Sequence, residues 1–465
     1  MLLRFFRIND PYRLLGILVV LILISLPLFI DPVNITLDEL KMFVLGEILN
    51  QGRSLYAEVL TSTPPLAAWI SGWVELLAGR SQTTRQVLSL VLIFFQLSFF
   101  TIMLINSRAH HENTYLPGLI FAVLAFFSFD VLSLSNELLA STMLLFVLHN
   151  LFKEIEFRIQ RDEIVLNLGL YVGIASLLVF SYAVYLPGVI IILAIFTRLT
   201  LRKALMVIFG FILPHAFVLL TYYLKGNYTA LIENFYLANL QGAVDTSSLN
   251  LTAVLMLCAM PALFLFLSWF MLNRGARLTK YQSQLSQIMF LWILLALAEV
   301  AISSGLKPHQ LITLIPPLSY FISHYILLIK RKRLAELTIW AFIISIVGIM
   351  YTARYDKINS IGYSNLFPKK TTQTAISGKR VMMLGTDWGL FENNTMASGF
   401  YDWKLSGPVF TQLNYFDHVV LIDKAFESGS PDVIVDEENL MLNVFKRIPK
   451  LQTQYRQEGN LYYRK

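Results

Sequence analysis

Residues 35–68 have the sequence ITLDELKMFVLGEILNQGRSLYAEVLTSTPPLAA, a polar stretch that follows the first long apolar run of the chain. Thr36 is followed three residues later by Glu39, a capping-box pattern that predicts a helix start with Asp38 in the first turn. Apolar residues then recur at helical spacing up to Gly52, a residue suited to ending a helix. The pattern predicts a polar loop held at one face of a membrane.

A second helix is expected after this turn, because proline at the first helical position loses no hydrogen bond and Pro64 and Pro65 stand there. The run 65–79 is short for a membrane span and contains two Trp and Glu75, so we expect it to lie in the membrane interface. This assignment leaves the loops rich in Lys and Arg on the cytoplasmic side. Counting 65–79 as a span would move most of them outside, against the positive-inside rule.

The composition of the whole chain is that of an integral membrane protein. Of its 465 residues, 56% are hydrophobic and 14% are charged, and the mean hydropathy is +0.61. A soluble protein is excluded by these values. The net charge of +7 comes from basic residues in short loops between apolar runs, so we predict membrane lipids as partners and no nucleic acid. The single Cys258 lies in an apolar run and can form no internal disulfide.

The predicted fold class is mainly α, a polytopic helical membrane protein of about eleven spans with a small C-terminal extracytoplasmic α/β domain. The expected spans are 13–31, 86–106, 115–133, 137–152, 165–181, 184–197, 204–224, 249–271, 286–303, 309–329 and 334–351. The division between the fifth and sixth spans stays open, since two short spans or one broken helix fit there. The short outer loops carry only Lys225 and Lys307 as basic residues.

The domains follow from this topology. Residues 1–351 form a transmembrane domain whose loop 31–85 lies outside, 352–376 form a linker, and 377–465 form the outer α/β domain. The tail has the alternation of small α/β structure. Its expected elements are a strand Arg380–Leu384, a helix Asn414–Glu427, a strand Asp432–Val435 and a strand near Leu461–Tyr463.

Four polar features are expected at the outer face. Asp38 and Glu39 stand at the helix start, although a capping box and the helix dipole also explain them. Glu137 follows the tight turn 133–136, and Lys307 and His309 open a late span. Cationic donors at a membrane surface suit a leaving phosphate, although snorkelling and capping are alternatives.

The fourth feature is Glu299, which lies about one turn below the outer end of its span. A carboxylate costs about 2.5–3.5 kcal/mol at a bilayer centre, so an acid within a span is a candidate for substrate binding. No Walker loop, dinucleotide-binding glycine pattern, HExxH or paired Cys motif occurs, so no cofactor is predicted from motifs.

The stretch 35–68 resembles the first extracytoplasmic loop of the GT-C superfamily of membrane glycosyltransferases, in its protein mannosyltransferase and aminoarabinose transferase branch. In that family an Asp-Glu pair precedes Gly-x-x-x-Tyr, an acidic residue and Lys-Pro-Pro-Leu. The matching residues are Asp38, Glu39, Gly52, Tyr56, Glu58, Pro64, Pro65 and Leu66. Thr63 stands where the family has Lys. The turn before Leu138, the entry to the span after Pro308 and the strand 431–435 also resemble family motifs.

The resemblance implies an inverting glycosyltransferase that moves a sugar from a polyprenyl-phosphate-linked donor to a glycan, lipid or protein acceptor at the outer face. Asp38, with Glu39 beside it, would be the general base. Lys307 and His309 would hold the leaving phosphate, and Glu137 would orient the acceptor or a divalent metal ion. Two residues, Tyr56 and Glu58, would line the loop.

Two other functions stay open from the sequence. Thr63 in place of Lys favours a catalytically inactive GT-C-like scaffold subunit of an envelope complex. A lipid-linked sugar transporter or flippase would need polar residues along a path through several spans, whereas the spans are nearly uncharged. In each case we expect a multi-pass protein of the bacterial cytoplasmic membrane, with the loop 31–85 and the tail outside the cytoplasm.

Overall fold

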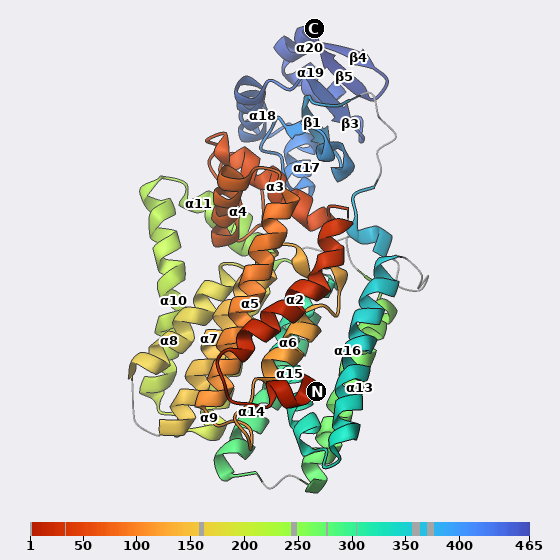
Figure 1. Ribbon diagram of the computed structural model, residues 1–465. Helices are drawn as coiled ribbons and strands as arrows, with labels where there is room; N and C mark the ends of the chain where they lie inside the picture. The colour runs from red at the N-terminus through yellow and green to blue at the C-terminus, as the bar shows by residue number, and fades with distance from the viewer. Residues whose placement is uncertain are drawn as a thin grey trace. The chain divides into compact units, whose positions relative to one another are not determined.

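In the computed structural model, the described residues are 2–32, 34–157, 162–242, 249–275, 278–303, 305–355, 363–369 and 376–465. The chain forms two compact units, each assembled from segments distant in sequence. Unit 1 contains Met1–Asn34, Gln82–Ala216 and Asp245–Ser364, and unit 2 contains Ile35–Ser81, Phe217–Val244 and Asn365–Lys465. Figure 1 labels the helices and strands of both units.

Membrane-length helices dominate unit 1 (Figure 1). In the part of the chain that the structure describes, eight helical segments are long and apolar enough to cross a membrane. They are α2 (Arg13–Ile30), α5 (Gln82–Asn106), α7 (Asn136–Phe157), α10 (Leu201–Leu224), α13 (Leu251–Gly275), α14 (Lys280–Ile302), η4 (Pro308–Leu314) together with α15 (Ile315–Leu328), and α16 (Lys332–Arg354). The chain is a multi-pass membrane protein.

Shorter helices complete unit 1. They are α1 (Leu2–Phe6), α6 (Leu116–Ala125), η1 (Phe129–Leu132), α8 (Asp162–Ser176), η2 (Phe180–Val184) and α9 (Tyr185–Phe196). Each of the eleven expected spans coincides with a helix, and α6, α8 and α9 are the three that fall short of full membrane length. The open division between the fifth and sixth spans is a 3-10 turn, η2, between two short helices.

The expected span 115–133 is not one continuous helix, because α6 ends at Ala125. The next residues form η1, in which the Ser133 hydroxyl donates to the Asp130 carbonyl at 2.7 Å. Serine and aspartate side chains that bond the local backbone compete with helical hydrogen bonds. The consequence is that Asp130 stands on a short 3-10 turn rather than inside a membrane helix.

The expected span 309–329 likewise begins as a 3-10 helix, η4, and becomes α-helical only at Ile315. Pro316 and Pro317 explain this, since they have no N–H to donate to the carbonyls four residues earlier. A 3-10 turn tightens the first part of the segment instead. His309 therefore lies in a short turn that leads into the helix.

Helices of unit 1 approach one another closely at glycine. A Cβ atom on Gly169 of α8 would lie 1.9 Å from the Val207 carbonyl oxygen of α10. Small residues of this kind allow backbones to meet in membrane proteins, where packing replaces the hydrophobic effect between helices.

Polar residues lie at both ends of the unit 1 helices. The direction of each helix shows which of these residues share an end. Helix α7 has Glu137 in its first turn and Lys153 near its last, so these residues lie at opposite ends. Helix α14 runs the other way, with Gln282 near its start donating to the Arg108 carbonyl at 3.0 Å, and Glu299 near its end. We call the end with Glu137 and Glu299 the polar end, and the end with Lys153 and Arg108 the basic end.

Unit 2 combines an α/β fold with helices from the middle and the start of the chain (Figure 1). A five-stranded sheet has the order β2-β1-β3-β5-β4, in which β1 pairs with β2 and β3 in parallel and β5 pairs with β3 and β4 antiparallel. The strands are β1 (Arg380–Leu384), β2 (Thr395–Met396), β3 (Val433–Asp436), β4 (Tyr455–Glu458) and β5 (Leu461–Arg464). The expected C-terminal strands are confirmed, and β2 and β4 are additional.

The helices of unit 2 come from the start, the middle and the end of the chain. They are α3 (Leu37–Asn50), α4 (Pro65–Ala78), α11 (Tyr228–Leu231), the π-helix η3 (Ile232–Leu237), α12 (Ala238–Leu240), η6 (Tyr363–Leu366, which begins in unit 1), η7 (Trp388–Glu392), α17 (Trp403–Thr411), α18 (Phe416–Gly429), α19 (Met441–Arg447) and α20 (Pro449–Gln454). Side chains such as Met382, Ile434 and Phe426 form its buried core. Most of the expected linker, 356–362 and 370–375, lies outside the described residues, and the predicted domain boundaries stay a prediction.

Candidate functional site

The imidazole of His309 lies between two carboxylates at the polar end of unit 1. Its Nδ1 is 3.2 Å from Asp130 Oδ2, and its Nε2 is 3.6 Å from Glu137 Oε1. The exposed fractions of the side chains are 11% for His309, 4% for Asp130 and 16% for Glu137. Buried charges are stable only when they are paired, so this trio is a single electrostatic group. We call it the His309 cluster.

Separate parts of the chain supply the His309 cluster. His309 comes from η4, which packs against η1 with Asp130, against α7 with Glu137 and against α14 with Glu299. The predicted pair of Glu137 and His309 is thus brought together in space by packing within unit 1.

Asp130 is the member of the cluster that the sequence reading missed. It lies within the expected span 115–133, and its Oδ1 accepts a hydrogen bond from the Ser128 hydroxyl. An acidic residue inside an apolar run is itself a signal, because the insertion cost of a charge makes such residues rare. The same argument that selects Glu299 applies to Asp130.

Glu299 is fully buried at the polar end of unit 1. Its Oε1 accepts a hydrogen bond from the Ser181 hydroxyl at 2.6 Å, and its Oε2 has no hydrogen-bond partner among the described residues. It also interacts electrostatically with Glu137 and His309. Lys307 precedes η4, where its backbone N–H donates to Gln310 Oε1 at 3.2 Å. Glu137, Glu299, Lys307 and His309 therefore all belong to unit 1.

Asp38 and Glu39 belong to unit 2, at the start of α3. Thr36 is the N-cap, and its Oγ1 accepts from the Glu39 N–H at 3.3 Å, as the sequence predicted. Asp38 is half-buried and Glu39 is 6% exposed. Burial, and then the carboxylates of Asp402 and Asp38, raise the pKa of the Tyr401 hydroxyl well above its usual value. Asp38 therefore interacts electrostatically with a phenol that stays protonated.

Tyr56 is buried beneath the loop that follows α3. Its backbone has the unusual φ of 69°, and its hydroxyl donates to the Thr63 carbonyl at 2.6 Å. Burial raises the pKa of Tyr56 well above its usual range, so it serves as a permanent donor. Asn234 donates to the Tyr56 carbonyl at 2.9 Å. These contacts make Tyr56 a support of the loop from within.

The side chains of Glu58 and Thr63 form local hydrogen bonds. Glu58 Oε2 accepts from the Ser54 N–H at 2.6 Å, which closes the turn. Thr63 Oγ1 lies 2.8 Å from Thr61 Oγ1. The position at which the GT-C motif has Lys thus carries a small neutral hydroxyl.

The C-terminal part of unit 2 holds the same loop by its backbone. The Leu60 N–H donates to the Gly399 carbonyl at 2.8 Å, and the Asp402 N–H donates to the Leu60 carbonyl at 2.9 Å. Gly399 is required at this approach, because a Cβ atom there would lie 1.8 Å from the Glu58 carbonyl oxygen. The loop 51–63 is therefore paired with residues more than three hundred positions later in the chain.

Arg80 links α3 to the C-terminal part of unit 2. It forms a bidentate ion pair with Glu47 of α3, in which Nη2 lies 2.7 Å from Oε2. The same guanidinium donates to the carbonyls of Phe391 at 2.8 Å and Asn394 at 2.9 Å. A planar guanidinium with several fixed donors suits such a multiple contact. The sequence contained no signal for it, since carbonyl partners can be any residue.

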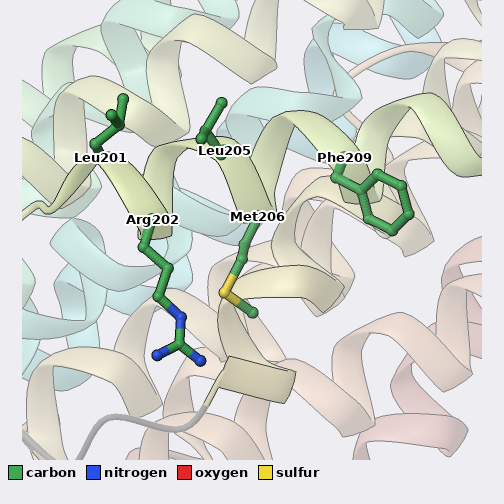
Figure 2. Close-up of a pocket in the computed structure, with 5 residues that line it drawn as sticks. All are labelled: Leu201, Arg202, Leu205, Met206 and Phe209. Carbon is green, nitrogen blue, oxygen red and sulfur yellow. The ribbon is translucent and has the colours of Figure 1, made fainter.

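No group of three or more His, Cys, Asp or Glu side chains in the described part of the chain has the arrangement of a metal site. The divalent ion considered from the sequence stays a prediction. A hollow of about 460 Å³ lies on one face of α10. Its lining residues, shown in Figure 2, are Leu201, Arg202, Leu205, Met206 and Phe209. Leu205 is 54% exposed, as expected of a face turned to lipid, and no predicted site residue lines this hollow.

The fold is similar to that of solved membrane proteins over nearly the whole chain. The crystal structure of ArnT from Cupriavidus metallidurans bound to undecaprenyl phosphate matches with a TM-score of 0.52 and 12% sequence identity, covering 94% of this chain and 88% of that one. The apo structure of the same ArnT matches with a TM-score of 0.50 and 13% identity over the same shares. ArnT is a GT-C glycosyltransferase, an aminoarabinose transferase, so the GT-C-like fold is confirmed.

No protein-family model matches the sequence, and no curated protein matches it. At 12% and 13% identity, the structural likeness concerns the fold.

Proposed function

We propose that the protein is an inverting glycosyltransferase of the cytoplasmic membrane, which moves a sugar from a polyprenyl-phosphate-linked donor to an acceptor at the outer face. The observation that carries the proposal is the His309 cluster at one end of a membrane-embedded bundle. The fold shared with an ArnT that binds undecaprenyl phosphate supports the donor class. A glycan, a lipid or a protein remains eligible as the acceptor.

In the proposed reaction, the bond between the sugar and the phosphate breaks as the acceptor oxygen attacks from the opposite side. The leaving phosphate gains negative charge, and preorganised cationic donors lower the free energy of that transition state. His309 and Lys307 would supply these donors. Asp130 accepts the Nδ1–H of His309, so the Nε2–H of the protonated ring would serve the phosphate on the side where Glu137 lies.

Asp38 would act as general base and take the proton of the acceptor hydroxyl. A carboxylate in the first turn of a helix is stabilised in its ionised form by the helix dipole, so it is ready to accept a proton but binds it weakly. Such a base suits a transition state with oxocarbenium character, in which the proton leaves late. Tyr56 would keep the loop in shape, and Glu137 would both pair with His309 and orient the acceptor.

In the proposed orientation, the polar end of unit 1 lies outside the cytoplasm, as expected from the sequence. The basic end carries Arg7, Lys203 and Arg202 in ion pairs with Glu112, Glu154 and Asp162. Lys and Arg accumulate on the cytoplasmic side of membrane proteins, which supports this direction.

The experiment follows the release of polyprenyl phosphate, a product that does not depend on which sugar is transferred. Purified protein in lipid nanodiscs is supplied with a panel of undecaprenyl-phosphate sugars and a membrane extract as acceptor. We expect Asp38→Asn to abolish release. The matched control is Asp417→Asn, because Asp417 is also the second residue of a helix, α18, but is exposed on its surface. Full release by Asp38→Asn would refute the proposed base.

A catalytically inactive scaffold is the second candidate, and the environment of Thr63 favours it. The family's cation is replaced by a hydroxyl that bonds Thr61, so one phosphate contact is lost. A scaffold would bind undecaprenyl phosphate weakly and release none from any donor. Restoring the cation by Thr63→Lys then tests the difference, since a gain of release would show that the rest of the machinery is competent.

A further inference from the structure

A second pocket, of about 430 Å³, lies between α5, α7 and α8 at the basic end of unit 1. Its polar lining includes Asn150 and Lys153 of α7 and Glu163 and Asn167 of α8. Aromatic side chains such as Phe146 and Tyr171 form its other walls. Lys153 is near the last turn of α7 and Glu137 is in the first, so this pocket is separate from the His309 cluster.

The pocket contains polar groups whose bonding is incomplete within the described residues. Asn150 is only 8% exposed, and its Nδ2 has no hydrogen-bond partner there. The Nδ1 of His149, which also lines the pocket, has none either. A buried amide without a partner is costly, and native proteins rarely retain one unless a ligand or water completes it. These atoms therefore indicate a ligand with hydrogen-bonding oxygen atoms.

The charges of the lining specify the chemistry of that ligand. Lys153 contributes one positive charge and Glu163 one negative charge, and neither forms an ion pair with any residue that the structure describes. A phosphate oxygen suits an ammonium and a neighbouring amide donor. A cationic amine suits the carboxylate at the exposed edge of the pocket. A lining with both charges does not favour a purely anionic ligand.

We propose that this pocket binds the headgroup of a zwitterionic phospholipid, with its phosphate on Lys153 and Asn150 and its amine on Glu163. The position between helices of a membrane bundle makes a lipid the source, since headgroups lie at the level of helix ends and basic pockets between helices bind them. The aromatic walls would cover the glycerol and the first part of the acyl chains. The proposal is independent of sugar transfer.

Native mass spectrometry of the purified full chain provides the test. Delipidated protein in detergent is titrated with phosphatidylethanolamine or with phosphatidylglycerol. We expect phosphatidylethanolamine to bind about threefold more tightly, because an exposed ion pair with Glu163 contributes modestly. Glu163→Gln should remove this preference while phosphatidylglycerol binding is kept. Lys153→Met should weaken both lipids about tenfold, since a hydrogen bond to a charged phosphate contributes more.

A matched control is Leu205→Ala, in the apolar hollow of Figure 2, which should leave both affinities unchanged. Thermal unfolding verifies that each variant is folded, and Asn150→Leu supplies a second loss of the phosphate contact should Lys153→Met fail to fold. Equal binding of the two lipids by the unmodified protein would overturn the proposal. Displacement of the lipid by soluble phosphorylethanolamine at equal concentration would overturn the assignment to a lipid.

Discussion

The polar end of unit 1 and the loop of unit 2 are held in different ways. In unit 1, His309, Asp130 and Glu137 position one another through their side chains. In unit 2, the loop after α3 is held mainly through backbone groups, as in the pairing of Leu60 with Gly399 and Asp402. A substitution in the first region should therefore change the chemistry directly, and it also leaves a buried charge without its partner. A substitution in the second should change the shape of the loop, and activity only through it.

His309→Ala is the sharpest test of the first half of this comparison. We expect the rate of polyprenyl phosphate release to fall about 10²–10³-fold, the usual cost of removing a donor that stabilises developing charge. The melting temperature in detergent should also fall, because two buried carboxylates lose their partner, so activity is compared per folded molecule. His418→Ala serves as control, because His418 is on α18 and makes a local contact with the Gln412 carbonyl. A large loss of stability with normal activity per folded molecule would make the cluster a structural element instead.

Gly399→Ala tests the part of the comparison that concerns the loop of unit 2. The added Cβ would lie 1.8 Å from the Glu58 carbonyl oxygen, so the loop must move. We expect the free energy of unfolding to fall by about 1–3 kcal/mol, as for overpacked sites, with activity lost in parallel. Differential scanning fluorimetry and the release assay measure the two effects. Gly348→Ala on α16 is the control, since nothing lies within 4 Å of its Cβ position.

Asp130→Asn separates the effect of charge from the effect of orientation within the His309 cluster. The amide oxygen can still accept from the imidazole, so the orientation of His309 is kept and only the charge is lost. We expect about a tenfold fall in the release rate, smaller than for His309→Ala, because one charge-assisted hydrogen bond becomes a neutral one. An unchanged release rate would contradict this role for Asp130.

The smallest effect concerns His110, in the loop between α5 and α6, outside the membrane-spanning helices. Burial, and then His324 and His111, lower the pKa of His110 well below its usual 6.5. The folded protein keeps this ring neutral, whereas the unfolded chain protonates near pH 6.5. Stability should thus be complete above pH 6.5 and fall below it, by about 1 kcal/mol at pH 6.

Melting temperatures at pH 8 and pH 6 measure this effect. The decrease should be smaller for His110→Gln, which has no proton to gain. Identical decreases in the two proteins would assign the pH dependence to other groups.

Local patterns carried most of what could be predicted from the sequence. Thr36 specifies the start of α3 because an N-cap hydrogen bond involves only neighbouring residues, and apolar runs locate the helices because a bilayer demands them. The pairing of Asp130 with His309 could not be predicted in this way, since it depends on the packing of two distant turns. The contacts of Arg80 could not be predicted either, because its partners are backbone carbonyls, which every residue type has. The positive φ of Tyr56 was likewise not predictable from the sequence.

The dependence of the loop on Gly399 and Asp402 has a consequence for biosynthesis. A ribosome makes residues 51–63 early and residues 399–402 near the end, so the nascent chain holds the loop without its backbone partners for most of its synthesis. The partners become available only after the last segment has been translated and has folded. A chain that stops short of residue 399 would insert its helices into the membrane and still lack the backbone partners that hold this loop.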